Sequence, residues 1–254
     1  MRVFILLLPL TFFTSSVTAQ PLAVTNTFSN TTIADADQVN QNFSDIETWV
    51  NAYLIIEGTN TALGGEALVN TTTGNDNTAV GHQALFSNTI GDANTASGAY
   101  ALYFNEDGNY NTASGWGALY LNTTGSENTA NGAGALFNTT SSGNTATGYN
   151  ALHSNTLGDL NTAVGHRALE NANGSLNNKN TAVGARTLNI NEGRDSTAVG
   201  YAALEFNITG VQNTAIGTNA LNQNIGGQEN TALGYTALVL NLSGNLNTAG
   251  GFES

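Results

Sequence analysis

A mainly polar pattern repeats along most of this chain, with apolar residues at the same positions of each copy. The pattern N-T-A-x-G-x-x-A-L starts twelve times, and the steps between starts are 16 to 19 residues, most often 17. Thr, Ala and Gly of N-T-A-x-G are present in all twelve copies, and Leu holds the ninth position of the eleven complete copies. A period this regular indicates one structural unit stacked on copies of itself. The starts are Asn60, Asn77, Asn94, Asn111, Asn128, Asn144, Asn161, Asn180, Ser196, Asn213, Asn230 and Asn247.

Each repeat predicts one short strand followed by turns. N-T-A-x-G is typical of a strand with Ala facing inward and Thr and the fourth residue facing outward. The next segment, G-x-x-A-L-x-x-N, is either a second strand or a single helical turn, and eight residues do not decide between them. The tail, as in residues 122–125, predicts a turn in which Gly supplies a positive φ. Coil length also changes in this tail: one residue fewer before Asn144 and Ser196, and two more around residues 173–179.

We therefore predict a mainly β fold: a parallel β-solenoid or β-roll of about 17-residue coils over residues 59–254. Small alanines and one leucine per coil are expected to form a narrow core. Because this core offers little apolar area against the cost of ordering the chain, we also expect the protein to be a homo-oligomer. The core leucines include Leu85, Leu102, Leu119, Leu136, Leu152 and Leu169.

The segment before the repeats has a different character. Residues 1–19 have the charged start, apolar run and small-residue end of a secretory signal peptide. Residues 20–58 form a polar lead-in and a predicted amphipathic helix that ends at Glu57-Gly58. This helix either pairs in a short coiled coil that oligomerises the chain or caps the solenoid. Its apolar seam consists of Val39, Phe43, Ile46, Val50 and Tyr53.

Composition and charge narrow the classes of partner. The net charge is −13, only 9% of residues are charged, and there is no Cys. An acidic, Lys-poor surface is a poor partner for nucleic acid or an anionic membrane, and without Cys there are no disulfides or thiolate metal sites. With the signal peptide removed, we expect no membrane span and a secreted, extracellular or cell-surface location.

Candidate catalytic and metal-binding groups are few. His82 and His166 occupy the same repeat position five coils apart, about 24 Å at the spacing of stacked strands, so they cannot share an ion. No G-x-S-x-G motif is present, and we predict no enzyme activity and no cofactor. Six acids just before repeat starts would line one corner, where they either bind Ca²⁺ weakly or only keep the protein dispersed. These acids are Asp76, Asp92, Glu127, Asp159, Asp195 and Glu229.

Aromatic residues share the position after Leu in four successive coils. If they face outward, this stripe is a binding surface for a sugar or a partner protein; if they face inward, it packs an oligomer core. The stripe consists of Phe86, Tyr103, Tyr120 and Phe137. Trp116, Tyr149, Tyr201 and Tyr235 share another repeat position, and the same alternatives apply to them.

Tandem N-T-A-x-G-x-x-A-L resembles the repeats of phage-type tail-fibre proteins and of related secreted bacterial proteins. It is more distantly similar to the heads of trimeric autotransporter adhesins, whose strands are of the type S-V-A-I-G. The resemblance implies a trimeric fibre on an exposed surface. We therefore expect an adhesive or structural protein that binds a host or cell-surface glycan or protein through its repetitive outer surface. The alternatives are an ice-binding β-solenoid that presents its Thr column, and a tail-spike-like protein that binds or degrades polysaccharide.

Overall fold

The computed structural model describes residues 40–45, 54–57, 59–172 and 178–254. The chain divides into two compact units, Met1–Ala52 and Tyr53–Ser254. In the first unit, residues 40–45 form a short helix in which Gln41 Nε2 donates a hydrogen bond to Asp45 Oδ1 at 2.8 Å. Phe43 of the predicted seam is exposed, while the rest of the seam and the predicted signal peptide lie outside the described residues. None of the described helical segments has the length and apolar character of a membrane span.

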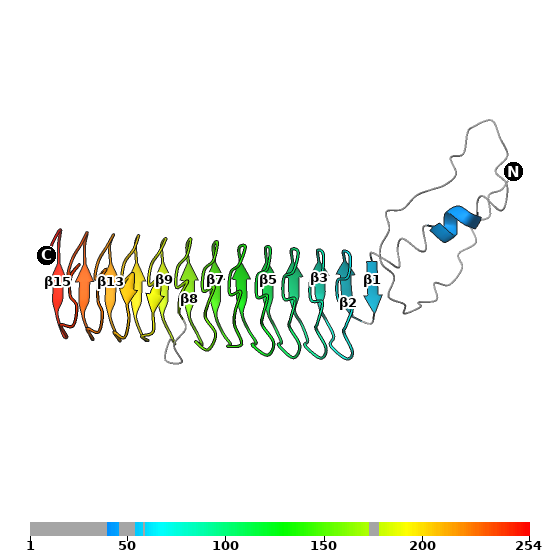
Figure 1. The fold of residues 1–254 in the computed structure, drawn as a ribbon, viewed down its shortest axis with the longest axis horizontal. Helices are drawn as coiled ribbons and strands as arrows, with labels where there is room; N and C mark the ends of the chain where they lie inside the picture. Colours follow the sequence, from blue (N-terminus) through cyan, green and yellow to red (C-terminus); the bar gives the residue numbers. More distant parts are fainter. Residues whose placement is uncertain (1–39, 46–53, 58, 173–177) are drawn as a thin grey trace, which may run out of the picture. The chain divides into compact units, whose positions relative to one another are not determined.

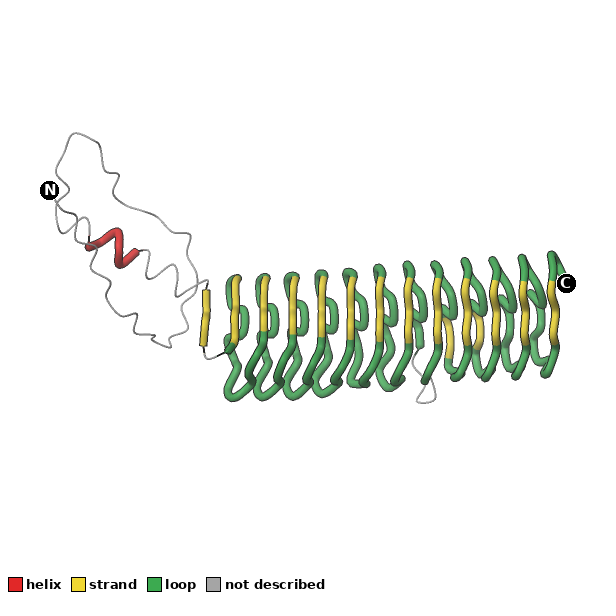
Figure 2. Tube along the Cα trace, turned by 180° about the vertical axis from the view of Figure 1, so that it is seen from behind, coloured by secondary structure: helices red, strands yellow, loops and turns green. Residues whose placement is uncertain are grey.

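The second unit is a parallel β-solenoid, which confirms the predicted fold class. One short strand of each coil lies beside the equivalent strand of the next, so that the strands form a single row with the turns behind them (Figure 1, Figure 2). Thirteen strands form this sheet, and β10 and β12 form a second, two-stranded sheet. The strands are β1 Leu54–Glu57, β2 Asn60–Leu63, β3 Thr78–Val80, β4 Thr95–Ser97, β5 Thr112–Ser114, β6 Thr129–Asn131, β7 Thr145–Thr147, β8 Thr162–Val164, β9 Thr181–Val183, β10 Ile190–Asn191, β11 Thr197–Val199, β12 Phe206–Asn207, β13 Thr214–Ile216, β14 Thr231–Leu233 and β15 Thr248–Gly250.

Strands of the long sheet pair parallel and in register from β2 to β15. Thr78 lies opposite Thr95 and Ala79 opposite Ala96, and the same match holds from coil to coil. In β3 the central Ala is buried and its two neighbours are exposed, which is the alternation predicted for a strand with one buried face. Coils are numbered here from the one that begins at Asn60, and positions within a coil are counted from its first residue.

In coils 1 to 11 the core of the solenoid contains the Ala at position 3, the residue at position 8 and the Leu at position 9; position 8 is Ala except in coil 8, where it is Thr187. The Ala and Leu side chains pack into one continuous apolar cluster along the stack. All six leucines named above have no exposed surface: Leu85, Leu102, Leu119, Leu136, Leu152 and Leu169.

The segment G-x-x-A-L-x-x-N, for which the sequence left a strand and a helical turn open, forms neither in most coils. In coil 2 it consists of hydrogen-bonded turns, with the Ala84 amide donating to Gly81 O at 3.3 Å and the Asn88 amide donating to Leu85 O at 3.3 Å. Leu85 itself is left-handed, with φ 52°, and the core Leu of every complete coil has the same conformation. The only short strands in this segment among the described coils are β10 and β12, which pair in parallel.

Two local predictions were wrong. The Gly of the tail motif, as at Gly125, does not supply a positive φ. Positive φ values fall on the Gly of N-T-A-x-G, such as Gly81 at 132°, on non-glycine residues, and on Gly117, Gly134 and Gly143. Gly91 in the tail is required by space instead, because a Cβ there would lie less than 3.0 Å from the carbonyl oxygen of Gly108 and from Asn88 Oδ1. The predicted helix also does not extend to Glu57, since Leu54–Glu57 is strand β1, paired antiparallel to β2. The β-branched pair Ile55-Ile56 favours this strand, which covers the edge of the first coil.

Candidate functional site

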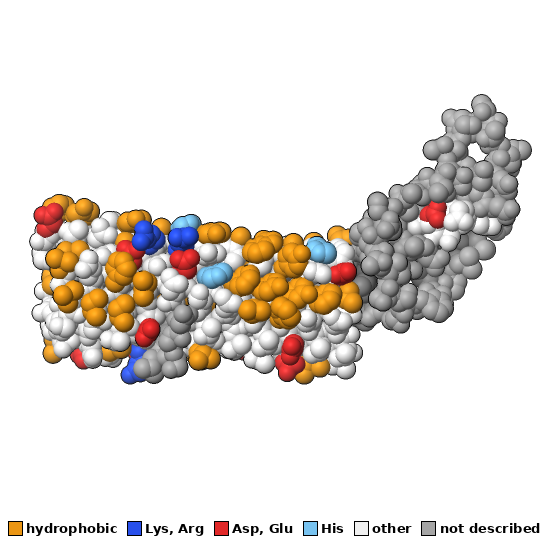
Figure 3. Space-filling view, viewed as in Figure 1, with side chains coloured by type: hydrophobic (Ala, Val, Ile, Leu, Met, Phe, Trp, Pro, Cys, Tyr) orange, Lys and Arg blue, Asp and Glu red, His pale blue; other side chains and the backbone are white. Residues whose placement is uncertain are grey.

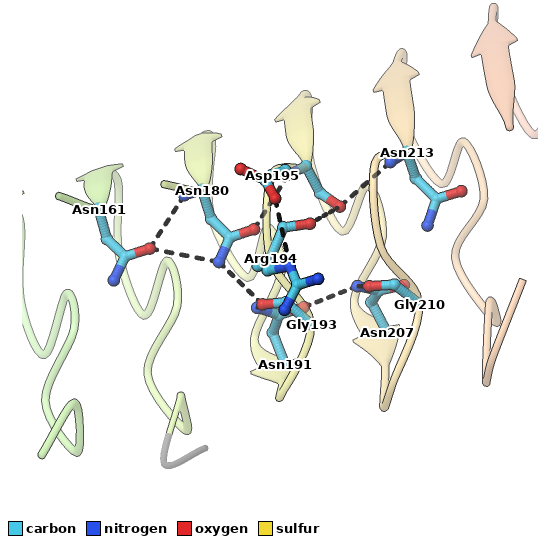
Figure 4. Close-up of polar contacts among 10 residues, drawn as sticks. Asn161, Asn180, Asn191, Gly193, Arg194, Asp195, Asn207, Gly210 and Asn213 are labelled. Atoms are coloured by element: carbon cyan, nitrogen blue, oxygen red, sulfur yellow. Dashed lines mark hydrogen bonds and ion pairs between the residues drawn. The ribbon is translucent and has the colours of Figure 1, made fainter. Parts of the chain in front are cut away.

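The outer surface is held in place by buried ladders of asparagine side chains. At position 1, the side-chain Nδ2 of Asn94 donates to Gly108 O of its own coil at 2.8 Å. The backbone N–H of Asn94 donates to Asn77 Oδ1 of the previous coil at 2.9 Å. The first bond closes the coil, and the second ties it to its neighbour. Ser196 replaces Asn at one position, where its hydroxyl accepts from the Asn213 amide at 3.2 Å and the ladder continues (Figure 4).

A second ladder runs through position 12. Asn105 Nδ2 donates to Asn88 Oδ1 at 2.7 Å and to Gly108 O at 2.9 Å, while Asn105 Oδ1 accepts from Asn122 Nδ2 at 2.7 Å. Asn207 Nδ2 bonds Asn191 Oδ1 and Gly210 O in the same way near the other end (Figure 4). Because an amide side chain both donates and accepts, each Asn of the ladder is a hydrogen-bond partner of the Asn in the next coil. These bonds fix the spacing of the coils.

An aromatic stack lies outside this core, on position 10 of coils 2 to 6. The ring centroids of Phe86 and Tyr103 are 5.0 Å apart, those of Tyr103 and Tyr120 are 5.2 Å apart, and those of Tyr120 and Phe137 are 4.8 Å apart. His153 continues the stack at 5.1 Å from Phe137. All five rings are partly buried, so the four predicted stripe residues lie neither inside this chain's core nor isolated in solvent.

Further rings broaden the stack into a patch. Phe104 packs edge-to-face with Tyr103 at 4.5 Å between ring centroids, and the Tyr100 ring lies tilted to Tyr103 at 6.0 Å. Trp116 lies 6.2 Å from Phe137 and is 57% exposed. Burial raises the pKa of Tyr103, and neighbouring Tyr120 adds to the rise. Figure 3 shows hydrophobic side chains gathered over the N-terminal coils of the solenoid. This set, the aromatic face, consists of Phe86, Tyr100, Tyr103, Phe104, Trp116, Tyr120 and Phe137.

Position 10 changes chemistry after His153. Asn189 Nδ2 donates to Glu170 Oε2 at 3.2 Å, and Asn222 Nδ2 donates to Glu205 Oε2 at 3.2 Å. Glu205 also pairs with Arg186, and its carboxylate raises the pKa of that guanidinium. Position 10 is thus polar in coils 7 to 10, with its two carboxylates paired with arginines. Basic and acidic side chains lie together over the middle coils (Figure 3).

The six predicted corner acids do not form one carboxylate column. Asp92 and Asp159 lie at position 16, where they accept backbone hydrogen bonds from Asn75 at 2.7 Å and from Ser142 at 2.8 Å. The other four are each the last residue of their coil and have a left-handed conformation: Asp76, Glu127, Asp195 and Glu229. In the part of the chain that the structure describes, no three His, Asp or Glu side chains gather to hold a metal ion.

The histidines are also separate from one another. His82 packs its edge on Tyr100 with ring centroids 5.4 Å apart, and His166 stacks on Tyr149 at the same distance. His153 Nδ1 lies 3.0 Å from Gly134 O, within hydrogen-bond distance.

A groove beside the aromatic face was not predicted. It runs along coils 3 to 6 at positions 11 to 13, and its lining includes Phe104, Leu121, Thr123, Asn138, Thr140 and Ser154. Phe104 belongs to both features, because its ring packs at 5.4 Å on Tyr120 of the stack. The sequence did carry a signal for the groove: coil 5 is one residue short and has Thr139 and Ser141 where most other coils have Asn and Gly.

Comparison with known proteins does not identify the chain. No protein-family model matches it, and no curated protein or solved structure gives a significant match.

Proposed function

We propose that this protein is a secreted or cell-surface fibrous repeat protein with an adhesive role, and that it binds its target through the aromatic face. The observation that carries this proposal is the stack of five rings on the outer surface of coils 2 to 6. Partly exposed aromatic groups that gather in one place on a surface are typical of an interaction site. The predicted signal peptide at residues 1–19 supports export, and the repeat resemblance supports a fibre that acts as a homotrimer.

The chemistry of the surface is better suited to binding than to catalysis. A regular solenoid places equivalent side chains about 4.8 Å apart in columns, so it presents an extended array rather than a convergent cluster. The stacked rings offer flat apolar area, and the Tyr hydroxyls and Trp indole N–H offer polar edges that suit a glycan or a protein surface. The weak Ca²⁺ binding considered for the corner acids has no role in this proposal.

The proposal is tested by measuring binding of the purified full chain to cells and to immobilised glycans. Tyr120 lies in the middle of the stack, and we expect Tyr120→Ser to weaken binding about tenfold or more. Tyr201→Ser is the matched control, because Tyr201 is an exposed ring in coil 9, away from the aromatic face. Equal binding by both variants, with the fold unchanged by circular dichroism, would remove the aromatic face from the proposal.

Ice binding is the second candidate, and one observation favours it. Thr at position 2 faces outward on each strand, in register from coil to coil, as at Thr78, Thr95 and Thr112. The neighbouring exposed position varies, from Val80 to Ser97 to Asn131, so the array is only partly regular. Thermal hysteresis by the full chain that is lost in Thr95→Tyr and kept in Tyr120→Ser would favour this candidate over adhesion.

A further inference from the structure

We infer that the groove beside the aromatic face is a binding subsite for a neutral oligosaccharide. This inference rests on the proposed adhesive function and names the class of ligand. Three separate observations meet at the junction of coils 4 and 5: the groove itself, a gap in the backbone hydrogen bonds between coils, and a gap in the asparagine ladder.

The backbone gap involves Thr123, which lines the groove, and its neighbour Thr124. At position 13 the carbonyl of each coil accepts amides from the coil before it: Thr89 O from Thr72 at 2.9 Å, Glu106 O from Thr89 at 3.1 Å, and Thr123 O from Glu106 at 3.0 Å. The pattern resumes where the Thr140 amide donates to Thr156 O at 3.2 Å. Among the described coils 1 to 5, the amides of Thr123 and Thr124 make no bond of this kind. They are therefore free to donate to a ligand.

The side chains of coil 5 explain the gap. Thr139 Oγ1 and Ser141 Oγ bond each other at 2.7 Å, and Ser141 Oγ also accepts from Asn155 Nδ2 of the next coil at 3.2 Å. Neither hydroxyl donates to Asn122 Oδ1, which has no hydrogen-bond partner. A short coil alone does not break the asparagine ladder. Coil 8 is equally short, but it keeps Asn191 and Gly193, and β10 pairs with β12 of the next coil. The gap in the ladder therefore comes from the loss of this Asn–Gly pair in coil 5.

The lining matches a neutral, hydroxyl-rich ligand. Phe104 and Leu121 supply apolar surface for the face of a sugar ring, and the hydroxyl and amide side chains of Thr123, Asn138 and Ser154 make no hydrogen bonds within the described structure. No charged residue lines the groove, and exposed Glu106 precedes Thr123 in its column. In a chain of net charge −13, this arrangement disfavours anionic glycans. Since the groove crosses four coils, about 14 Å, it suits a chain of a few sugar units.

The test uses an array of neutral and acidic oligosaccharides with the full-length protein. The first variant replaces residues 138–143 with the sequence L-N-T-T-G-S-E of residues 121–127. This change restores the missing residue, the Asn and the Gly, so it fills the groove and gives Asn122 Oδ1 a partner. We expect neutral-glycan binding to fall about tenfold or more while the melting temperature stays equal or rises. Because the variant is designed to fold at least as well, a loss of binding cannot be attributed to unfolding.

The second variant is Phe104→Ala, with Phe206→Ala as the matched control at the same position of coil 9. We expect the first to lose neutral-glycan binding and the second to keep it. Binding retained by both groove variants overturns the subsite but leaves the proposed adhesive function in place. Binding only to acidic glycans, or only to a protease-sensitive cell-surface target, also overturns it. A wild-type protein that binds neither glycans nor cells removes the proposed function itself.

Discussion

At the residue scale, the buried asparagines decide how the coils stack. An Asn side chain offers two donors and one oxygen with two acceptor sites, so one residue type bonds to its own coil and to both neighbours. Asn105 makes such bonds to Asn88, Gly108 and Asn122. The ladder stops where the next coil has no amide to donate, which leaves Asn122 Oδ1 and Asn155 Oδ1 buried and without partners. Thr139 and Ala172 occupy the positions that would supply those amides.

Replacing one ladder residue should therefore cost more than its own bonds. In Asn105→Ala, Asn88 Oδ1 loses its donor and one N–H of Asn122 Nδ2 loses its acceptor, both in the interior, while Asn122 Nδ2 still donates to Gly125 O. At about 1 to 3 kcal/mol for each unsatisfied buried group, we expect a loss of about 2 to 4 kcal/mol in unfolding free energy. Urea denaturation followed by circular dichroism measures it. Asn109→Ala is the control: its Oδ1 accepts from the exposed Asp92 amide, and we expect a loss below about 1 kcal/mol.

At exposed residues in the left-handed conformation, by contrast, we expect a substitution by glycine to stabilise the fold. Glu127 has φ 60° and an exposed side chain, and Gly143 holds the equivalent position of the next coil at φ 70°. The left-handed conformation costs a non-glycine residue about 1 to 2 kcal/mol, against about 0.5 to 1 for ordering a glycine. Glu127→Gly should therefore raise the unfolding free energy by about 0.5 kcal/mol, measured as above. Glu127→Val should lower it, and a rise with Val would contradict the strain argument.

At the scale of the coil, the strand was predictable and the turns were not. Thr-Ala-x alternates exposed, buried and exposed, and this two-residue period reads directly from the sequence. The left-handed core Leu could not be predicted, because Leu has no preference for that conformation and only stacking of each coil on the next holds it there. For the candidate site, the phase of Phe86 and Tyr103 predicted that their rings share one column. The groove depends on Thr139 and Ser141. Their departure from the repeat is visible in the sequence, but its effect on the neighbouring coils is not.

Glycine in the tail of the coil is a packing requirement, and this can be tested. A Cβ at Gly108 would collide with the Gly125 carbonyl and with Asn105 Oδ1, so Gly108→Ala must push two coils apart. We expect a loss of about 2 to 4 kcal/mol, as for other changes that disturb a buried hydrogen-bond network. Gly226→Ala is the control, because its only near neighbour is the flexible Thr209 hydroxyl at 3.3 Å. Equal melting temperatures for the two variants would contradict the predicted close approach.

At the scale of the whole molecule, the same columns carry different chemistry along the solenoid. Position 10 is aromatic from Phe86 to Phe137 and polar from Glu170 to Asn222. All basic residues after Arg2 fall in coils 7 and 8: Arg167, Lys179, Arg186 and Arg194. Since each coil contacts mainly its neighbours, such local changes are tolerated without altering the rest of the fold. The repeat therefore provides a uniform backbone, and its column at position 10 is aromatic only toward the N-terminal end.

The oligomeric state decides whether the aromatic face can bind a ligand, because rings that pack between chains are not accessible. We expect light scattering to give three times the chain mass, with association through the predicted helical seam. Deleting residues 20–52 keeps β1 and should yield a monomer with an unchanged β spectrum. Tyr120→Ser in the full chain should remain trimeric. If the deleted chain stays trimeric and Tyr120→Ser dissociates it, the rings are the interface between chains. The adhesive surface would then have to lie elsewhere on the coils.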